Sequence, residues 1–196
     1  MVRDLKSSLI AVVVLTLVLG LAIPALFTGF AQLAFSSQAD GSLIKVNGKV
    51  VGSRLAAQAF TKPQYFHPRP SATTPAWNAG ATTFANLGPT NLDLAKAIRQ
   101  RARAILELER PYNPGMTIHD IPVDAVTTSG SGIDPDISPA NARLQSRRVA
   151  AVRHVSLATV QRLIGDNTDG RSLGFFGEPG INVLKLNVAL DNLGAK

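Results

Sequence analysis

The most prominent hydrophobic pattern is one long apolar run near the N-terminus. No charged residue lies between Lys6 and Asp40, and the run from Leu9 to Phe35 covers 27 residues with few polar interruptions. As an α-helix this run would be roughly 40 Å long, more than the hydrocarbon thickness of about 30 Å of a bilayer. The pattern therefore predicts a membrane-spanning helix over about residues 9–35, within an anchor of residues 1–36.

A cleaved signal peptide is the alternative interpretation of this run. Its apolar region is usually about 7 to 15 residues long and ends at a site of small residues. The run here is longer, and Ala31 and Ala34 do not have the spacing of such a site. We therefore expect an uncleaved anchor, in which Pro24 frees the backbone carbonyl near Gly20 and disturbs the helix there.

The orientation of the anchor is not decided by its flanking charges, because basic residues lie on both sides of it. Long segments cross a membrane largely regardless of charge, whereas a short basic stub tends to stay in the cytoplasm. We expect a cytoplasmic N-terminus and an extracytoplasmic domain over residues 37–196.

Beyond the anchor, the pattern predicts a hairpin followed by an irregular segment. Two short apolar stretches, Ser42–Val46 and Lys49–Val51, flank Asn47-Gly48, a pair that suits a type I′ turn. The segment from Thr61 to Thr90 contains five prolines, which favour extended backbone at the preceding residues. A stretch of this length without helix or strand inside a compact domain is usually functional.

Three stretches of the domain have the apolar spacing or the cap residues that predict a helix. One helix is predicted from Leu92 until Pro111 stops it, with Thr90 or Asn91 as its cap. A second begins at Ser138-Pro139 and runs to about Val152. A third begins at Ser156 and ends at Gly165.

Two further apolar stretches resemble strands. Ile121 to Thr128 reads as a strand, and alternation over residues 184–190 favours another near the C-terminus, although a helix also fits there. With the helices, this predicts an α+β fold: a single N-terminal transmembrane helix followed by one mixed extracytoplasmic domain.

Composition and charge narrow the function classes. The chain of 196 residues is 45% apolar and only 17% charged, with a net charge of +7. It has no cysteine, and its three histidines, His67, His119 and His154, are too far apart in sequence for a local metal site, so we expect no bound metal. Arginines around the helix after Leu92 are not interleaved with aromatic residues, which favours a solvated face or an acidic partner over nucleic acid.

Catalytic motifs are also missing from the sequence. There is no phosphate-binding G-x-x-x-x-G-K-[ST] motif, and the stretch around Ser131 lacks the outer glycines of a G-x-S-x-G elbow, so we expect no catalytic residue. One weak nucleotide-binding candidate remains, a glycine-rich loop that could form an anion nest or simply a tight turn. Its residues are Ser129, Gly130, Ser131 and Gly132.

Several motifs, taken in order, carry a family resemblance over essentially the whole chain. They are Tyr65-Phe66-His67-Pro68-Arg69-Pro70-Ser71-Ala72, Asn86-Leu87-Gly88-Pro89-Thr90-Asn91, Thr128-Ser129-Gly130-Ser131-Gly132-Ile133-Asp134-Pro135, Ile137-Ser138-Pro139-Ala140-Asn141-Ala142 and Gly174-Phe175-Phe176-Gly177-Glu178-Pro179. With the anchor before them, the chain resembles the C subunit of the Kdp-type potassium-transporting ATPase. It departs from the family pattern at Phe84-Ala85, Ile133 and Asp136.

The resemblance implies a noncatalytic subunit of a high-affinity, ATP-driven potassium importer in the bacterial inner membrane. The implied partners are a channel-like A subunit, a P-type ATPase B subunit, a small hydrophobic F subunit and membrane lipid. The family is described as assisting ATP use by the catalytic subunit, which implies no cofactor of the chain's own. The alternative is a nucleotide-binding chaperone that raises the ATP affinity of the catalytic subunit directly.

The motifs also supply candidate residues for a partner interface. We expect the Pro-rich segment and the adjoining loop to form a docking surface, or to support one from inside, although they could merely cover the core of the domain. The candidates are Phe66, His67, Arg69, Asn86, Gly88, Pro89, Thr90, Asn91, Asp134 and Pro135.

Direct ATP binding conflicts with the expected topology, because ATP is cytoplasmic. The loop from Ser129 to Pro135 contributes Asp134, with Asp136 next to it, whereas Arg147 and Arg148 lie roughly 12 to 14 Å along the following helix. Short-range repulsion from the carboxylates outweighs screened attraction at that distance. We therefore expect the loop not to bind ATP phosphate unless Mg²⁺ lies between the carboxylates and the phosphates. We expect Asp134 to accept hydrogen bonds from the turn's own backbone.

Overall fold

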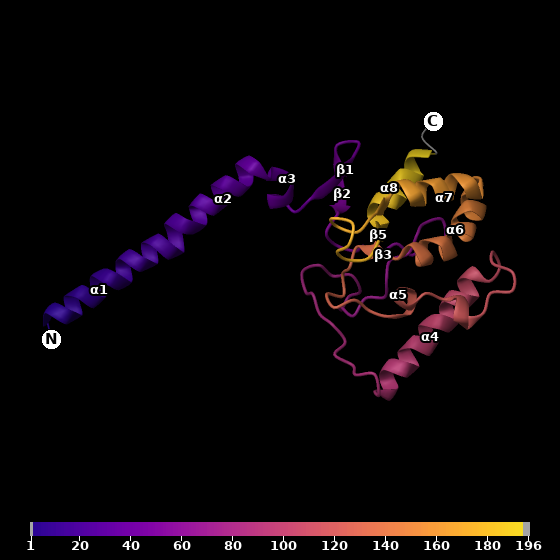
Figure 1. Cartoon of the computed structure of the whole chain (residues 1–196), viewed down its shortest axis with the longest axis horizontal. Coiled ribbons are helices and arrows are strands. Elements are labelled where there is room, and N and C mark those ends of the chain that lie inside the picture. Colours follow the sequence, from indigo (N-terminus) through magenta and orange to yellow (C-terminus); the bar gives the residue numbers. More distant parts are fainter. Residues whose placement is uncertain (1, 194–196) are drawn as a thin grey trace. The chain divides into compact units, whose positions relative to one another are not determined.

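The N-terminal apolar run forms one helix, Val2–Ala34, in the computed structural model, which describes residues 2–193 (Figure 1). It consists of α1 (Val2–Leu17), a π-helical turn η1 (Val18–Ala22) and α2 (Ile23–Ala34). The helix is 33 residues long, and no side chain in its most apolar stretch is buried. By length and composition it can cross a membrane, as the sequence predicted.

The π-helical turn lies where the sequence predicted a disturbance. Pro24 has no backbone N–H to donate to the carbonyl of Gly20, and Gly20 is inside η1. A missing bond in the helical ladder is a common cause of such a turn. A short helix, α3 (Ser36–Ala39), follows α2.

The chain divides into two compact units, residues 1–43 and residues 44–196. The predicted hairpin is present as β1 (Leu43–Val46) and β2 (Lys49–Ser53). Its turn residues Asn47 and Gly48 both have positive φ, at 51° and 77°, as a type I′ turn requires.

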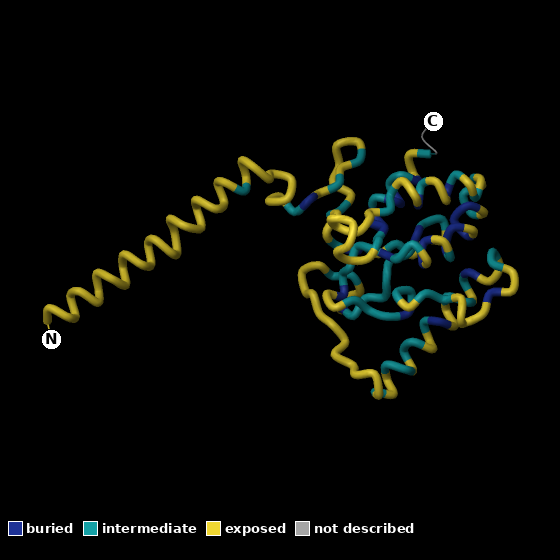
Figure 2. Tube along the Cα trace, in the orientation of Figure 1, coloured by how far each residue is buried: buried dark blue, intermediate teal, exposed yellow. Residues whose placement is uncertain are grey.

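The Pro-rich segment contains neither helix nor strand, as predicted, and its two parts differ in burial (Figure 2). Residues 61–80 are partly buried over most of their length, whereas residues 81–90 are all exposed. The packed part therefore belongs to the body of the domain and the exposed part to its surface.

The three predicted helices are confirmed as α4 (Leu92–Glu109), α6 (Pro139–Arg153) and α7 (Leu157–Asp166). Each begins after a side-chain cap, in which the oxygen of Asn91, Ser138 or Ser156 accepts a hydrogen bond from a backbone N–H of the first turn. The cap of α4 is thus Asn91 and not Thr90.

The strand predicted over Ile121 to Thr128 is wrong. A 3-10 turn, η2 (Ile118–Asp120), comes directly before this stretch. The stretch itself contains a short helix, α5 (Val123–Val126), after Pro122. The carboxylate of Asp124 accepts hydrogen bonds from Ser138 and Asn141 at the start of α6, at distances of 2.8 to 3.0 Å. These long-range bonds stabilise a turn of helix that the local alternation could not indicate.

The strand favoured over residues 184–190 is also wrong, and the alternative helix is present as α8 (Val183–Leu193). Its buried positions include Val183, Leu186 and Leu190, a helical spacing that coincides in part with the alternation. Before it lies a small antiparallel sheet of β3 (Asp136–Ile137), β5 (Gly180–Asn182) and β4 (Thr168–Asp169), with β5 in the centre.

The main core lies between this sheet and helices α6, α7 and α8. Ile181 of the central strand pairs with Ile137 on one side and Thr168 on the other. Phe66 of the Pro-rich segment is fully buried in the same cluster as Ile181 and Leu186. The segment therefore contributes a large apolar side chain to the core, which fixes its position on the domain.

Candidate functional site

A buried arginine joins the Pro-rich segment to two helices. Arg148 of α6 is fully buried, and its Nε lies 2.7 Å from Oε1 of Glu109, at the end of α4. Its other nitrogens donate to the side chain of Gln145 and to the backbone carbonyls of Pro63 and Tyr65. One guanidinium thus holds α4, α6 and the segment together.

Two side-chain amides hold the backbone of the segment as a neighbouring strand would. Asn187 of α8 accepts from the N–H of Phe66 and donates to its carbonyl, both at 2.9 Å. Gln145 of α6 does the same for His67, at 2.7 and 3.1 Å. Because a buried backbone needs partners for its polar groups, these amides allow the segment to lie inside the domain without pairing in a sheet.

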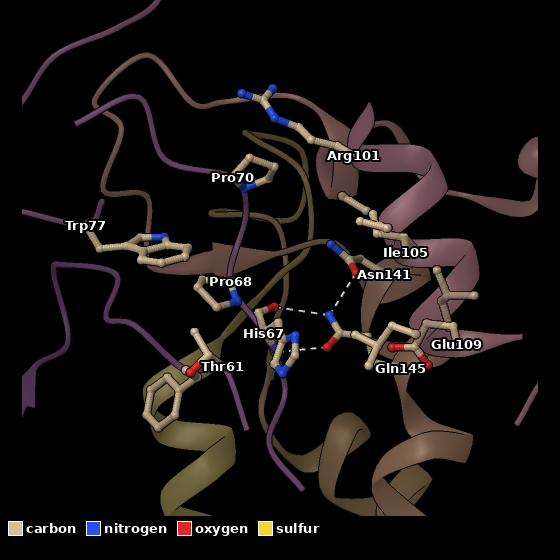
Figure 3. A pocket seen from close by; sticks show the side chains of 15 residues that line it. Thr61, His67, Pro68, Pro70, Trp77, Arg101, Ile105, Glu109, Asn141 and Gln145 are labelled. Atoms are coloured by element: carbon tan, nitrogen blue, oxygen red, sulfur yellow. Dashed lines mark hydrogen bonds between the residues drawn. The ribbon is translucent and has the colours of Figure 1, made fainter. Parts of the chain in front are cut away.

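A cavity of about 290 Å³ lies between the segment and helices α4 and α6 (Figure 3). Pro68, Pro70 and Trp77 line one side of the cavity, and Ile105 lies opposite them. The side chain of Gln145 also lines it, hydrogen-bonded to the backbone of His67. The lining is mainly apolar, and the polar groups of Gln145 are used within the protein. The cavity is therefore suited to an apolar group.

Two ionisable groups next to this cavity have shifted pKa values. Burial, and then the nearby charge of Arg148, lowers the pKa of His67 below its ordinary 6.5. The folded domain consequently binds fewer protons at His67 than the unfolded chain does, so this residue reduces stability as the pH falls below about 6.5. Burial raises the pKa of Glu109, and Arg148 opposes that rise.

The glycine-rich loop is attached to the Pro-rich segment by polar contacts. Nη1 of Arg69 lies 2.7 Å from Oδ2 of Asp134, and the Ser71 hydroxyl donates to the Gly132 carbonyl at 2.7 Å. The sequence singled out Arg69 and Asp134 separately, and the fold brings them together across 65 positions of the chain. Asp134 Oδ1 also accepts from the N–H of Asp136, as predicted.

Several backbone donors of the loop are already used by its own side chains. The N–H of Gly132 donates to Ser129 Oγ at 3.0 Å, and the N–H of Ile133 donates to Ser131 Oγ at 3.2 Å. The first turn of α6 is capped by Ser138, whose Oγ accepts from the N–H of Asn141. An anion nest needs free N–H groups that converge on the anion, and these internal bonds remove some of the donors that would build one.

The remaining predicted interface residues fall into different environments. Phe66 lies in the core, so it can support a surface only from inside, and His67 and Pro135 are half-buried. Asn86, Gly88, Pro89 and Thr90 lie in the fully exposed stretch, and Asn91 caps α4. The fold therefore separates the candidates into two groups. The packed base lies in the body of the domain and contains Phe66, His67, Arg69, Asp134 and Pro135, and the exposed strip is residues 81–90.

Four residues that no sequence motif marked as partners of the Pro-rich segment hold it from inside the domain: Glu109, Gln145, Arg148 and Asn187. A signal was present, since Asn141, Gln145 and Arg148 recur at helical spacing along one face of α6. Such a polar line on an otherwise buried helix indicates buried hydrogen-bond partners elsewhere in the chain.

Comparison with known proteins identifies the family. A family model described as "KdpC: K+-transporting ATPase, c chain" matches residues 5–192. The chain belongs to the KdpC family. A potassium-transporting ATPase KdpC subunit of Methylococcus capsulatus is 50% identical over 194 residues, which cover 98% of this chain and 100% of the relative. The corresponding subunit of Mycobacterium tuberculosis is 47% identical over 193 residues, covering 97% and 99%.

Membership in the KdpC family makes this chain an accessory subunit of a potassium-transporting ATPase. The matched range contains almost the whole apolar helix and all the elements from β1 to β5. The packed base and the exposed strip therefore both lie inside the part of the chain that defines a KdpC subunit.

Proposed function

We propose that the chain is a noncatalytic subunit of a high-affinity potassium importer, needed for assembly of the complex in the bacterial inner membrane. Helix Val2–Ala34 spans the membrane once, with a cytoplasmic N-terminus and a periplasmic domain. The orientation rests on the short basic stub before the helix, which tends to stay in the cytoplasm. The partners are a channel-like A subunit, a P-type ATPase B subunit and a small hydrophobic F subunit, together with membrane lipid.

The observation that carries the assembly role is the exposed strip of residues 81–90. These ten residues form no helix or strand and are all exposed. At one end the N–H of Ala81 donates to the carbonyl of Asn78, and the other end leads into the Asn91 cap of α4. Two large apolar side chains, Phe84 and Leu87, are 54% and 36% exposed within it. An irregular surface strip that leaves large apolar side chains in water is typical of a surface that a partner covers.

ATP use by the complex is assisted indirectly in this proposal. The loop of residues 129–132 uses backbone donors internally, and Asp134 and Asp136 place negative charge beside it. An effect on the catalytic subunit needs only a coupling free energy of about 1 to 3 kcal/mol between remote sites. Docking of the exposed strip on a partner that changes conformation supplies a route for such coupling.

The assembly role is tested by the double variant Phe84→Ser, Leu87→Ser in the full chain. We expect recovery of the other ATPase chains with the tagged variant, in mild detergent, to fall at least about tenfold, because interface energy concentrates in a few apolar anchors. The unfolding midpoint of the variant should stay close to that of the wild type, since both side chains are already exposed.

The matched control is Val50→Ser, Leu55→Ser, which removes two apolar side chains of similar exposure, 53% and 57%, from another surface. It should leave recovery of the complex unchanged. If both double variants reduce recovery equally, the loss comes from general changes in solubility. A wild-type chain that recovers no ATPase chains would overturn the proposed function itself.

A second prediction concerns nucleotide. Calorimetric titration of the purified full chain with ATP, with and without Mg²⁺, should show no saturable binding in the micromolar range. The reason is the negative charge of Asp134 and Asp136 and the internal use of the loop's N–H groups. Saturable binding that Ser131→Ala or Asp134→Ala abolishes would instead support the direct nucleotide-binding chaperone.

A further inference from the structure

Helix α4 presents a row of basic side chains on its exposed face. Lys96, Arg99 and Arg103 of the helix and Arg110, the residue directly after it, are all exposed, and their spacing of three, four and seven residues places them along one side. Two exposed acidic residues of the helix lie at helical spacing beside this row, Asp93 at its start and Glu107 near its end. The row, which we call the α4 basic face, is roughly 21 Å long.

The α4 basic face takes no part in the ion pairs of the described domain. Within residues 2–193, the ion pairs of the domain involve Arg69, Arg148, Arg153, Arg171 and Lys185, and none involves a cation of this face. By contrast Arg101, on the opposite side of the same helix, donates to the carbonyl of Val126 and is half-buried. The helix thus separates one structural arginine from four cations that are directed to solvent.

The basic face continues the exposed strip of residues 81–90. The strip leads directly into α4 (Figure 1), and the first helical residue, Leu92, is 83% exposed. Leu92, Lys96, Arg99 and Arg103 follow one another at helical spacing, so the exposed apolar residue next to the strip and the cations share one side of the helix. The two form one surface with an apolar part and a basic part.

We infer that the α4 basic face docks on an acidic protein surface of another chain of the potassium-transporting ATPase, next to the contact made by the strip. This inference rests on the proposed assembly function and adds the charge of the partner. Complementary charges are the usual partner of such a row, since they fix the register and direction of docking. Glu107 between Arg103 and Arg110 gives the face an ordered sign pattern, which suits a protein surface better than a uniform layer of lipid phosphates.

The transported ion supplies a second physical reason. The four cations of the α4 basic face outnumber the exposed carboxylates of Asp93 and Glu107 beside them, so the face has a net positive potential, which lowers the local concentration of K⁺ near the domain. Carboxylates of a partner chain that pair with the face cancel this potential and bind the domain at the same time. In a complex that transports potassium, the pairing thus removes an electrostatic obstacle that the isolated chain would present.

The test is charge reversal in the full chain, with the triple variant K96E/R99E/R103E. We expect recovery of the other ATPase chains in detergent to fall at least about tenfold, since three attractions become repulsions. Wild-type recovery should decrease as NaCl rises from about 50 to about 500 mM, and the variant should lose most of that salt dependence. Glutamate is a good helix former and the sites are exposed, so the unfolding midpoint should change little.

The matched control is R143E/R147E/R162E, which changes the net charge by the same amount at exposed sites of α6 and α7. It should leave recovery near the wild-type value. The neutral variant K96Q/R99Q/R103Q should lie between the wild type and the reversal.

Three outcomes would overturn the inference. Recovery of K96E/R99E/R103E at the wild-type level would show that the face is free in the complex, and an equal loss in the control would assign the effect to net charge alone. A loss that appears only when anionic phospholipid is added to the detergent would assign the face to lipid. In each case wild-type recovery stays intact, which distinguishes these results from failure of the proposed function.

Discussion

Replacing Arg148 with methionine is expected to lower the free energy of unfolding of the domain by about 3 to 5 kcal/mol, because it leaves the buried Glu109 carboxylate without its partner. It also removes hydrogen bonds to Gln145 and to the carbonyls of Pro63 and Tyr65. For a domain of this size the unfolding midpoint should drop by roughly 6 to 20 °C. Thermal unfolding of the purified full chain, followed by circular dichroism, measures the change.

The neighbouring arginine provides the control for this prediction. Arg147→Met alters an exposed position of the same helix and should change stability by no more than about 0.5 kcal/mol. If Arg148→Met fails to fold, the double variant Arg148→Met, Glu109→Leu keeps the test informative. It removes both buried charges and should be more stable than Arg148→Met alone. Equal stability of Arg148→Met and Arg147→Met would contradict the assigned role of the ion pair.

Replacing Gly132 with alanine is expected to separate the glycine-rich loop from the Pro-rich segment. Gly132 has φ +72°, and a Cβ there would lie 2.5 Å from the carbonyl oxygen of Thr83 and 3.1 Å from Thr73 Cγ2. The strained backbone and the displaced segment should together cost about 2 to 4 kcal/mol. Denaturant unfolding measures the loss, and limited proteolysis should cut the exposed strip faster in the variant.

Gly130, two residues earlier in the same loop, is the matched control. A Cβ at Gly130 would meet no atom within 4 Å, and its φ is not in the left-handed region. Gly130→Ala should therefore leave stability within about 1 kcal/mol of the wild type. If the two alanine variants lose the same stability, the close approach of Gly132 to Thr83 does not hold the loop in place.

The elements that the sequence predicted correctly share one property, which is that local signals specify them. The long apolar helix near the N-terminus, the hairpin at Asn47-Gly48 and the helices capped by Asn91, Ser138 and Ser156 all follow from residues near in sequence. The irregular Pro-rich segment also belongs to this group. Capping, turn geometry and proline restriction act over a few residues, so they can be read without knowledge of the fold.

The two incorrect strands show where local signals fail. The apolar residues among 184–190 fit both the alternation of a strand and one face of a helix. Contacts with the core of the domain decided in favour of the helix. Around Asp124, bonds to Ser138 and Asn141 determined the backbone. In both places a long-range contact decided between local conformations of similar energy.

For the candidate site, the sequence by itself pointed to the Pro-rich segment and the glycine-rich loop as candidates, and to Arg69 and Asp134 within them. Only the tertiary structure decided that these two pair with each other, that Phe66 is a core residue and that Arg148 with Glu109 forms the buried centre. The physical reason is that an ion pair, or a hydrogen bond between a side-chain amide and the backbone, needs its two atoms within about 3 Å of each other. Residues separated by 39 to 121 positions meet at that distance only after the chain has packed its core.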